Sequence, residues 1–192
     1  MDREIKIGLV AALVVLVSAQ SALAGMFEVS TGLWYQRSNY SDESYTWIRR
    51  IGLSGAYYFT SVSGVEVGFQ DVRTRTKISD EATHFNLQDS TYVDRIYSVN
   101  WVQQLAPRDM PFQPYFKAGV AQINRDIQGT FYGNPSKLKS EDTLTAVFSF
   151  GFRFFISQKF AFRAEGTTYI GAGGLKTWQN NIAANVGLSV FF

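Results

Sequence analysis

Residues that could carry acid–base catalysis are scarce in this sequence. His84 is the only histidine, and Asp80, Glu81, Asp89 and Ser90 lie near it in one polar stretch. A Ser–His–acid site requires hydrogen bonds between all three groups, and a loop does not hold such a geometry in place. We therefore expect His84 to be a solvated loop residue and the protein not to be an enzyme.

Metal and cofactor sites also lack candidate ligands. The chain has no cysteine, so a transition-metal site would have a single histidine and no sulfur ligand. We expect no metal and no cofactor. The missing cysteines also exclude a disulfide scaffold and a lipid-modified cysteine. The formal net charge of +2 gives no electrostatic reason to expect a nucleic-acid partner.

The remaining candidates are charged residues that lie opposite rows of apolar ones. From Thr143 to Ile156, apolar side chains occupy every second position, which is typical of a strand, and Arg153 lies on the other face. A buried charge is very costly unless it is paired, so we expect the charges on such faces to form an ion-pair network inside a barrel. The network would either pack the interior or gate a narrow path for water or ions. Five residues belong to it: Glu66, Lys117, Arg153, Arg163 and Glu165.

Eight segments with this alternation must position the charges. We predict the strands Met26–Arg37, Tyr45–Phe59, Gly64–Arg73, Thr91–Leu105, Pro114–Asn124, Thr143–Ile156, Phe160–Tyr169 and Asn181–Phe192. Each is about as long as a tilted membrane-spanning strand, which needs roughly 9–11 residues. Long polar connections, including Thr74–Ser90 and Arg125–Asp142, alternate with shorter turns. The predicted fold is all-β, an eight-stranded antiparallel up-and-down transmembrane barrel with loops on one side and turns on the other.

The start of the chain has the order of a secretory signal peptide. Arg3 and Lys6 precede an apolar run from Ile7 to Val17, and an A-x-A site ends at Ala24. The run is too short to span a bilayer, which takes roughly 20 apolar residues. We expect residues 1–24 to be a cleavable signal peptide and residues 25–192 to form the barrel domain.

The end of the chain resembles the C-terminal insertion signal of bacterial outer-membrane barrels. The signal has a polar residue, a glycine two positions later, and hydrophobic residues three and five positions beyond the glycine, the last of them terminal. Asn185, Gly187, Val190 and Phe192 match it. The resemblance implies that the last strand is recognised by the barrel-assembly machinery.

The whole chain from Gly25 is similar to the small eight-stranded outer-membrane barrels, the OmpA/OmpX-like and OmpW-like proteins. Residues 114–121 and 160–166 match the fifth- and seventh-strand patterns of that family. The resemblance implies a monomer in the outer membrane of a Gram-negative bacterium, in contact with lipid and lipopolysaccharide. It further implies a structural role or contact with a surface partner through the long loops. A narrow channel or an OmpW-like conduit for small or apolar molecules is the alternative, and a lipid-modifying enzyme is a third.

Two other features bear on the fold. Gly32-Leu-Trp34 spells the G-x-W signature of lipocalins, soluble barrels whose apolar row points inward. Here the opposite row is rich in small residues, which suits a crowded interior better. Aromatic residues near strand ends favour membrane-interface girdles: Trp34, Trp47, Trp101, Trp178, Tyr35, Tyr45, Tyr57, Phe112, Tyr115 and Tyr169.

Overall fold

The computed structural model describes residues 25–39, 41, 44–80, 85–107, 109–131, 134–170 and 182–192. The predicted signal peptide, His84 and Trp178 lie outside these residues. The strands are β1 (Met26–Asn39), β2 (Tyr45–Tyr58), β3 (Ser63–Asp80), β4 (Phe85–Gln104), β5 (Phe112–Phe131), β6 (Asn134–Phe155), β7 (Phe160–Ile170) and β8 (Ile182–Phe191).

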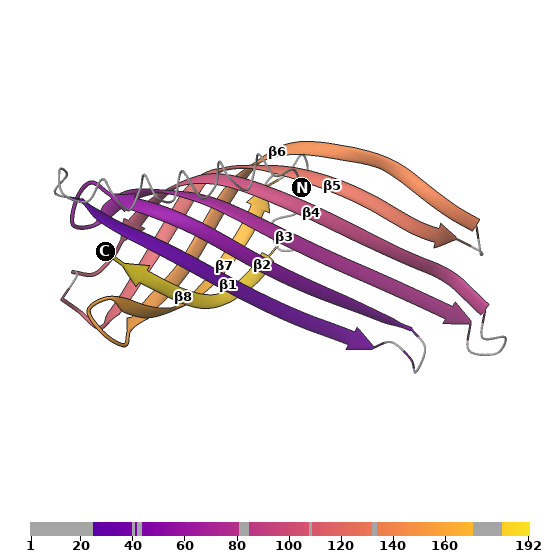
Figure 1. The fold of residues 1–192 in the computed structure, drawn as a ribbon, viewed down its shortest axis with the longest axis horizontal. Helices are drawn as coiled ribbons and strands as arrows, with labels where there is room; N and C mark the ends of the chain where they lie inside the picture. The colour runs from indigo at the N-terminus through magenta and orange to yellow at the C-terminus, as the bar shows by residue number, and fades with distance from the viewer. Residues whose placement is uncertain are drawn as a thin grey trace.

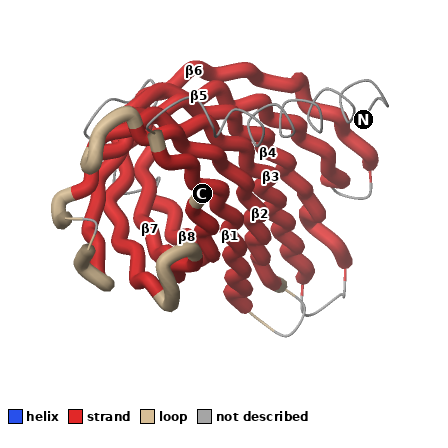
Figure 2. Tube along the Cα trace, turned by 60° about the vertical axis from the view of Figure 1, so that its left-hand side comes forward, coloured by secondary structure: helices blue, strands red, loops and turns tan. Residues whose placement is uncertain are grey.

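The eight strands close into one antiparallel barrel, which confirms the predicted fold. Each strand pairs with the next in the chain, and β8 pairs with β1 (Figure 1). Closure pairs the edge strands with each other, so no open sheet edge remains between β1 and β8 along their shared ladder. The short turns after β2, β4 and β6 gather at one end of the barrel, near the C-terminus (Figure 2). No helix in the described part of the chain is long and apolar enough to cross a membrane.

The apolar rows face outward, as the alternation predicted. Leu33 and Phe150 are 59% and 61% exposed, while Ser30 and Ser149, on the opposite faces of the same strands, are buried. Large apolar side chains on the outside and polar ones inside are typical of barrels surrounded by lipid. A lipocalin has the reverse arrangement, so the lipocalin interpretation of Gly32-Leu-Trp34 is wrong.

The predicted long loops Thr74–Ser90 and Arg125–Asp142 are wrong. β3 continues to Asp80 and β4 begins at Phe85, while β5 continues to Phe131 and β6 begins at Asn134, so each pair forms a long hairpin. Polar pairs hold these extensions together: Arg75 binds Asp89 at 2.8 Å and Arg125 binds Asp94 at 2.7 Å. Beyond the apolar band only isolated apolar residues, such as Ile78 and Ile127, stand among polar ones, so the hydrophobic period of two that marks a strand disappears.

The seam that closes the barrel is short. β1 pairs with β8 from Glu28↔Phe191 to Leu33↔Val186, whereas β1 pairs with β2 along its whole length to Asn39↔Tyr45. Among the described residues, residues 34–39 of β1 therefore pair with β2 on one side and with no strand on the other.

Candidate functional site

Six charged side chains are buried in the described part of the chain, and all of them lie inside the barrel. They are Glu28 on β1, Glu66 on β3, Lys117 on β5, Arg153 on β6, and Arg163 and Glu165 on β7. Three are acidic and three are basic, so their formal charges cancel. The interior can therefore bury all six without a net charge, provided that each finds a partner.

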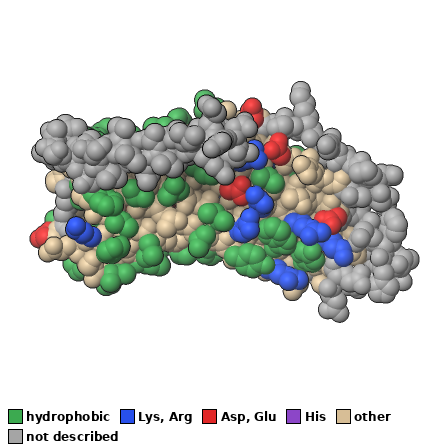
Figure 3. Space-filling view, viewed as in Figure 1, with side chains coloured by type: hydrophobic (Ala, Val, Ile, Leu, Met, Phe, Trp, Pro, Cys, Tyr) green, Lys and Arg blue, Asp and Glu red, His purple; other side chains and the backbone are tan. Residues whose placement is uncertain are grey.

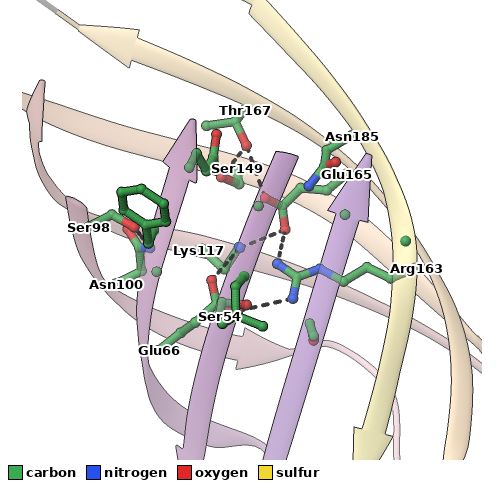
Figure 4. Close-up of a pocket in the computed structure, with 18 of the residues that line it drawn as sticks. Ser54, Glu66, Ser98, Asn100, Lys117, Ser149, Arg163, Glu165, Thr167 and Asn185 are labelled. Atoms are coloured by element: carbon green, nitrogen blue, oxygen red, sulfur yellow. Dashed lines mark hydrogen bonds and ion pairs between the residues drawn. The ribbon is translucent and has the colours of Figure 1, made fainter. Parts of the chain in front are cut away.

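Four of the charges form a closed ring of contacts near mid-barrel (Figure 4). Lys117 Nζ lies 2.7 Å from both Glu66 Oε1 and Glu165 Oε2. Arg163 bridges the same two carboxylates, with 3.1 Å from Nη1 to Glu66 Oε2 and 2.6 Å from Nη2 to Glu165 Oε2. Each base thus contacts both acids, an arrangement in which a buried charge is fully paired.

The other two charges form a bidentate pair nearer the turn end. Arg153 Nε and Nη2 donate to Glu28 Oε1 and Oε2 at 3.0 and 2.7 Å. Tyr58 and Ser30 donate to the same carboxylate at 2.7 and 2.8 Å. Charge-assisted bidentate bonds of this kind are among the strongest in proteins. Arg153 is fully buried, and its Nη1 has no hydrogen-bond partner among the described residues.

Tyr115 joins the two groups. Its hydroxyl donates to Glu165 Oε2 at 2.8 Å, and the Arg153 guanidinium carbon lies 4.2 Å from its ring centroid. Tyr115 and Tyr169, whose hydroxyl donates to Gln70 at 3.3 Å, point inward, so their assignment to an aromatic girdle is wrong. The reason is strand phase, because Tyr115 lies on the same face as Lys117 and Tyr169 on the same face as Glu165.

An apolar cluster, which we call the plug, lies inside the barrel toward its turn end. Ala56, Tyr58, Val102 and Tyr115 pack together there, with Met26 against them. On the other side of the ion pairs lies a polar cavity of about 30 Å³, lined by Glu66, Lys117, Arg163 and Glu165 among others. A water molecule needs roughly 10–15 Å³, so the cavity has room for about two.

The walls of the cavity offer hydrogen bonds to such water. Arg163 Nε, Asn100 Oδ1 and Asn185 Oδ1 have no hydrogen-bond partner within the described ranges of the chain. All three residues line the cavity. Polar walls with open hydrogen-bonding groups suit water rather than an apolar ligand.

The structure thus brings together all five charged residues that were expected inside the barrel, and it adds Glu28, Tyr58 and Tyr115. The alternation places Glu28 on the inward face of its strand, although the network predicted from the sequence does not include it. Its position opposite Phe27 and Val29 was the available signal. The sequence does not indicate which of the three acids pairs with which of the three bases, since the partners come from strands far apart in the chain.

The four residues of the expected insertion signal lie on β8 and at its end. Gly187 pairs with Gly32 across the seam, and a Cβ at Gly187 would collide with the backbone of Thr31. Asn185 lies beside Gly32, so closely that a Cβ on Gly32 would strike its amide. Phe192 is 51% exposed on the outside, and Val190 shares its face. Their role in insertion is separate from this geometry and stays a prediction.

Several solved structures have the same architecture. The N-terminal β-barrel domain of Pseudomonas aeruginosa OprF matches with a TM-score of 0.58 and 14% identity, over 88% of this chain and 98% of that one. The outer membrane protein OprG of Pseudomonas aeruginosa matches with a TM-score of 0.55 and 14% identity, over 90% of this chain and 98% of that one. Ail, the attachment invasion locus protein of Yersinia pestis, matches with a TM-score of 0.53 and 14% identity, over 88% of this chain and 99% of that one. At this identity the likeness concerns the fold alone.

The sequence itself identifies the family. No curated protein matches it. The family model described as the outer membrane protein beta-barrel domain matches residues 9–189, nearly the whole chain. The outward apolar rows and the closed eight-stranded barrel agree with that match. The chain therefore belongs to the outer membrane protein beta-barrel domain family and is an integral protein of the bacterial outer membrane.

Proposed function

We propose that this protein is a closed, non-conducting barrel whose role is structural or is contact with other surfaces through its long hairpins. The observation that carries the proposal is the neutral, mutually paired charge network above an apolar plug. It supports a packed interior rather than a passage. We propose no catalytic step, and no group of three or more potential metal ligands occurs among the residues that the structure describes.

Conduction would require the network to separate. An ion passing Arg153 would have to displace a guanidinium that is fully buried against Glu28, Tyr58 and Tyr115. Separation of the pair would leave both charges buried and unpaired, and one uncompensated buried charge alone costs about 3–5 kcal/mol, so we expect spontaneous opening to be rare.

The hairpins supply the surface for recognition. β3–β4 and β5–β6 continue beyond the apolar band, and in outer-membrane barrels the longer connections face the exterior. Function in such scaffolds resides mainly in exposed connections. The proposal also includes a monomer, removal of residues 1–24 on export, and recognition of Asn185, Gly187, Val190 and Phe192 by the barrel-assembly machinery.

Planar-bilayer recording of the refolded chain 25–192 tests the closed state. We expect no stepwise conductance from the wild type, while Arg153→Ala, which opens space beside the plug, should give at most brief small events. Sustained wild-type channels would overturn the proposal. Heat-dependent gel migration establishes that both proteins are folded.

The hairpin role is tested in cells. A variant in which residues 127–138 are replaced by Asn-Gly shortens the β5–β6 hairpin and leaves the barrel ion pairs intact. We expect it to keep heat-dependent migration and a normal barrier to a fluorescent apolar dye, but to reduce adhesion of the cells to a test surface. A strain without the protein serves as the comparison. The proposal would be contradicted if both this strain and the variant matched the wild type in adhesion and in the barrier to the dye.

The short seam favours a second candidate, a conduit that delivers apolar molecules sideways into the membrane. The β1–β8 ladder ends at Leu33↔Val186. Because the chain has no cysteine, disulfides can test this seam cleanly. Linking Tyr35→Cys to Ala184→Cys should abolish uptake of a fluorescent fatty acid if molecules leave there, while linking Thr31→Cys to Leu188→Cys, within the paired ladder, should not. Equal uptake in the linked and reduced forms of both variants would exclude the conduit.

A further inference from the structure

Basic side chains gather on the outer wall of the barrel, directly beyond the apolar band. Figure 3 shows several of them at one end of the face formed by the first strands, next to exposed apolar side chains. On the outward-facing positions of β1–β5 the wall has an excess of three positive charges. The charged positions are Arg37, Arg49, Arg73, Arg75, Lys77 and Arg95, against Asp71, Asp89 and Asp126.

Two of these arginines lie directly opposite each other. Arg49 on β2 is the register partner of Arg73 on β3. Arg49 lies on the same face as the exposed Ile51 and Leu53, and Arg73 on the same face as the exposed Phe69, so both point away from the interior. Like charges directly opposite each other on one face of a sheet are destabilising, so an anion that contacts both side chains would stabilise the pair.

Among the described residues, the neighbouring acids compensate Arg73 in part and leave Arg49 without an ion pair. Asp89 is engaged by Arg75 through two hydrogen bonds of 3.0 and 2.8 Å. Asp71 contacts Arg73 through one bond of 3.0 Å, and the Arg73 side chain is still 48% exposed. Arg49 makes no ion pair within the described ranges, and its Nε has no hydrogen-bond partner there.

The chemistry of the site favours a phosphate group. Two guanidinium groups side by side offer planar pairs of N–H donors that match phosphate oxygens. Tyr35, the register partner of Arg49 on β1, is 63% exposed and supplies an amphipathic ring of the kind that collects at the membrane–water boundary. The arginines therefore lie at the level where apolar wall gives way to polar wall.

We infer that Arg49 and Arg73 bind a phosphate group of a membrane-anchored glycolipid, the phosphorylated lipid A part of lipopolysaccharide. The side chains extend from the lipid-facing wall, not from a hairpin tip, so a lipid phosphate reaches them more directly than a soluble one. The hairpin end of the barrel faces the exterior, where the outer leaflet lies. The inference rests on the membrane location and is independent of whether the lumen conducts.

Native mass spectrometry of the protein in phosphatidylcholine nanodiscs tests the site. The probes are purified lipid A with its phosphates and the same lipid A after enzymatic dephosphorylation. We expect Arg49→Gln/Arg73→Gln to bind phosphorylated lipid A about tenfold more weakly than the wild type, the loss expected for one charge-assisted hydrogen bond or more. The two proteins should bind dephosphorylated lipid A equally. Lys159→Gln, an exposed charge in the turn at the opposite end, is the matched control and should behave as the wild type.

Three results would overturn the inference. The first is equal binding of phosphorylated lipid A by the double variant and the wild type, with folding of both verified by heat-dependent migration. The second is an equal loss in Lys159→Gln, which would indicate nonspecific attraction. The third is full displacement of lipid A by millimolar inorganic phosphate, which would indicate a site for free phosphate.

Discussion

Arg153 on β6 forms a bidentate pair with Glu28 on β1, although these strands are not neighbours in the sheet. We predict that Arg153→Met lowers the free energy of unfolding by about 3–5 kcal/mol, because Glu28 loses its bidentate partner and keeps only the more distant Arg163, at 3.8 Å, as a buried counter-charge. The double variant Glu28→Gln/Arg153→Met should recover part of this loss. Urea unfolding in lipid vesicles measures the losses of the two single variants and of the double variant. A loss in the double variant equal to the sum of the two single losses would contradict the coupling.

Tyr115 tests the link between the two groups of charges. Tyr115→Phe keeps the ring beside Arg153 and removes the hydroxyl that donates to Glu165. We expect a loss of about 1–3 kcal/mol in the free energy of unfolding, since a buried acceptor loses a donor. Tyr97→Phe, on the exposed lipid-facing wall, should change it little. Equal effects of the two substitutions would show that the interior hydroxyl has no special role.

Gly187 tests the seam. Gly187→Ala places a Cβ against the backbone of Thr31, so β1 and β8 must separate, and we expect a loss of about 1–3 kcal/mol with slower refolding. Gly55→Ala is the matched control, because a Cβ there meets nothing within 4 Å. Refolding followed by heat-dependent migration gives the comparison. A variant at Gly187 that folds as fast as the control would show that the seam relaxes easily.

The β3–β4 hairpin should depend on pH through Asp89. The hydrogen bonds from Arg75 hold the pKa of the Asp89 carboxyl below its usual value, and they raise the pKa of Arg75. A lowered folded-state pKa means that the pair stabilises the hairpin above the unfolded pKa of about 3.9 and that this stabilisation is lost as pH falls through the folded value.

NMR titration of the carboxyl carbons measures this directly. Asp89 should titrate below the usual aspartate value of about 3.9. Replacement of Arg75 by Gln should raise the midpoint of Asp89 toward the usual value. An unchanged midpoint in that variant would rule out Arg75 as the cause.

Much of the barrel could be predicted from the sequence because lipid imposes a strict alternation. Phe148, Phe150 and Phe152 mark the outer face of β6 without any knowledge of its neighbours, and their phase puts Arg153 inside. The same phase should have placed Tyr115 inside, but its aromatic character suggested a girdle instead. The direction of an aromatic side chain on these strands follows from its position in the alternation, not from its residue type.

The hairpin extensions and the individual pairs were beyond the reach of this alternation. In β3 beyond Arg73, Ile78 is the single apolar residue among polar ones, so no hydrophobic period distinguishes strand from loop. The partners of Glu28 depend on barrel geometry, since Arg153 lies 125 positions away along the chain. Such a pairing follows from strand register, which the hydrophobic pattern constrains only to within steps of two residues.

The charge network also constrains the order of events during assembly. Glu28 meets Arg153, and Glu66 meets Lys117 and Arg163, only between strands that are not neighbours in the sheet. A growing, open sheet therefore exposes these charges without their partners, next to hydrocarbon in which such groups are very unfavourable. These charges pair only when the barrel closes. An open intermediate is therefore unstable in the bilayer, which favours cooperative closure and insertion of the whole barrel.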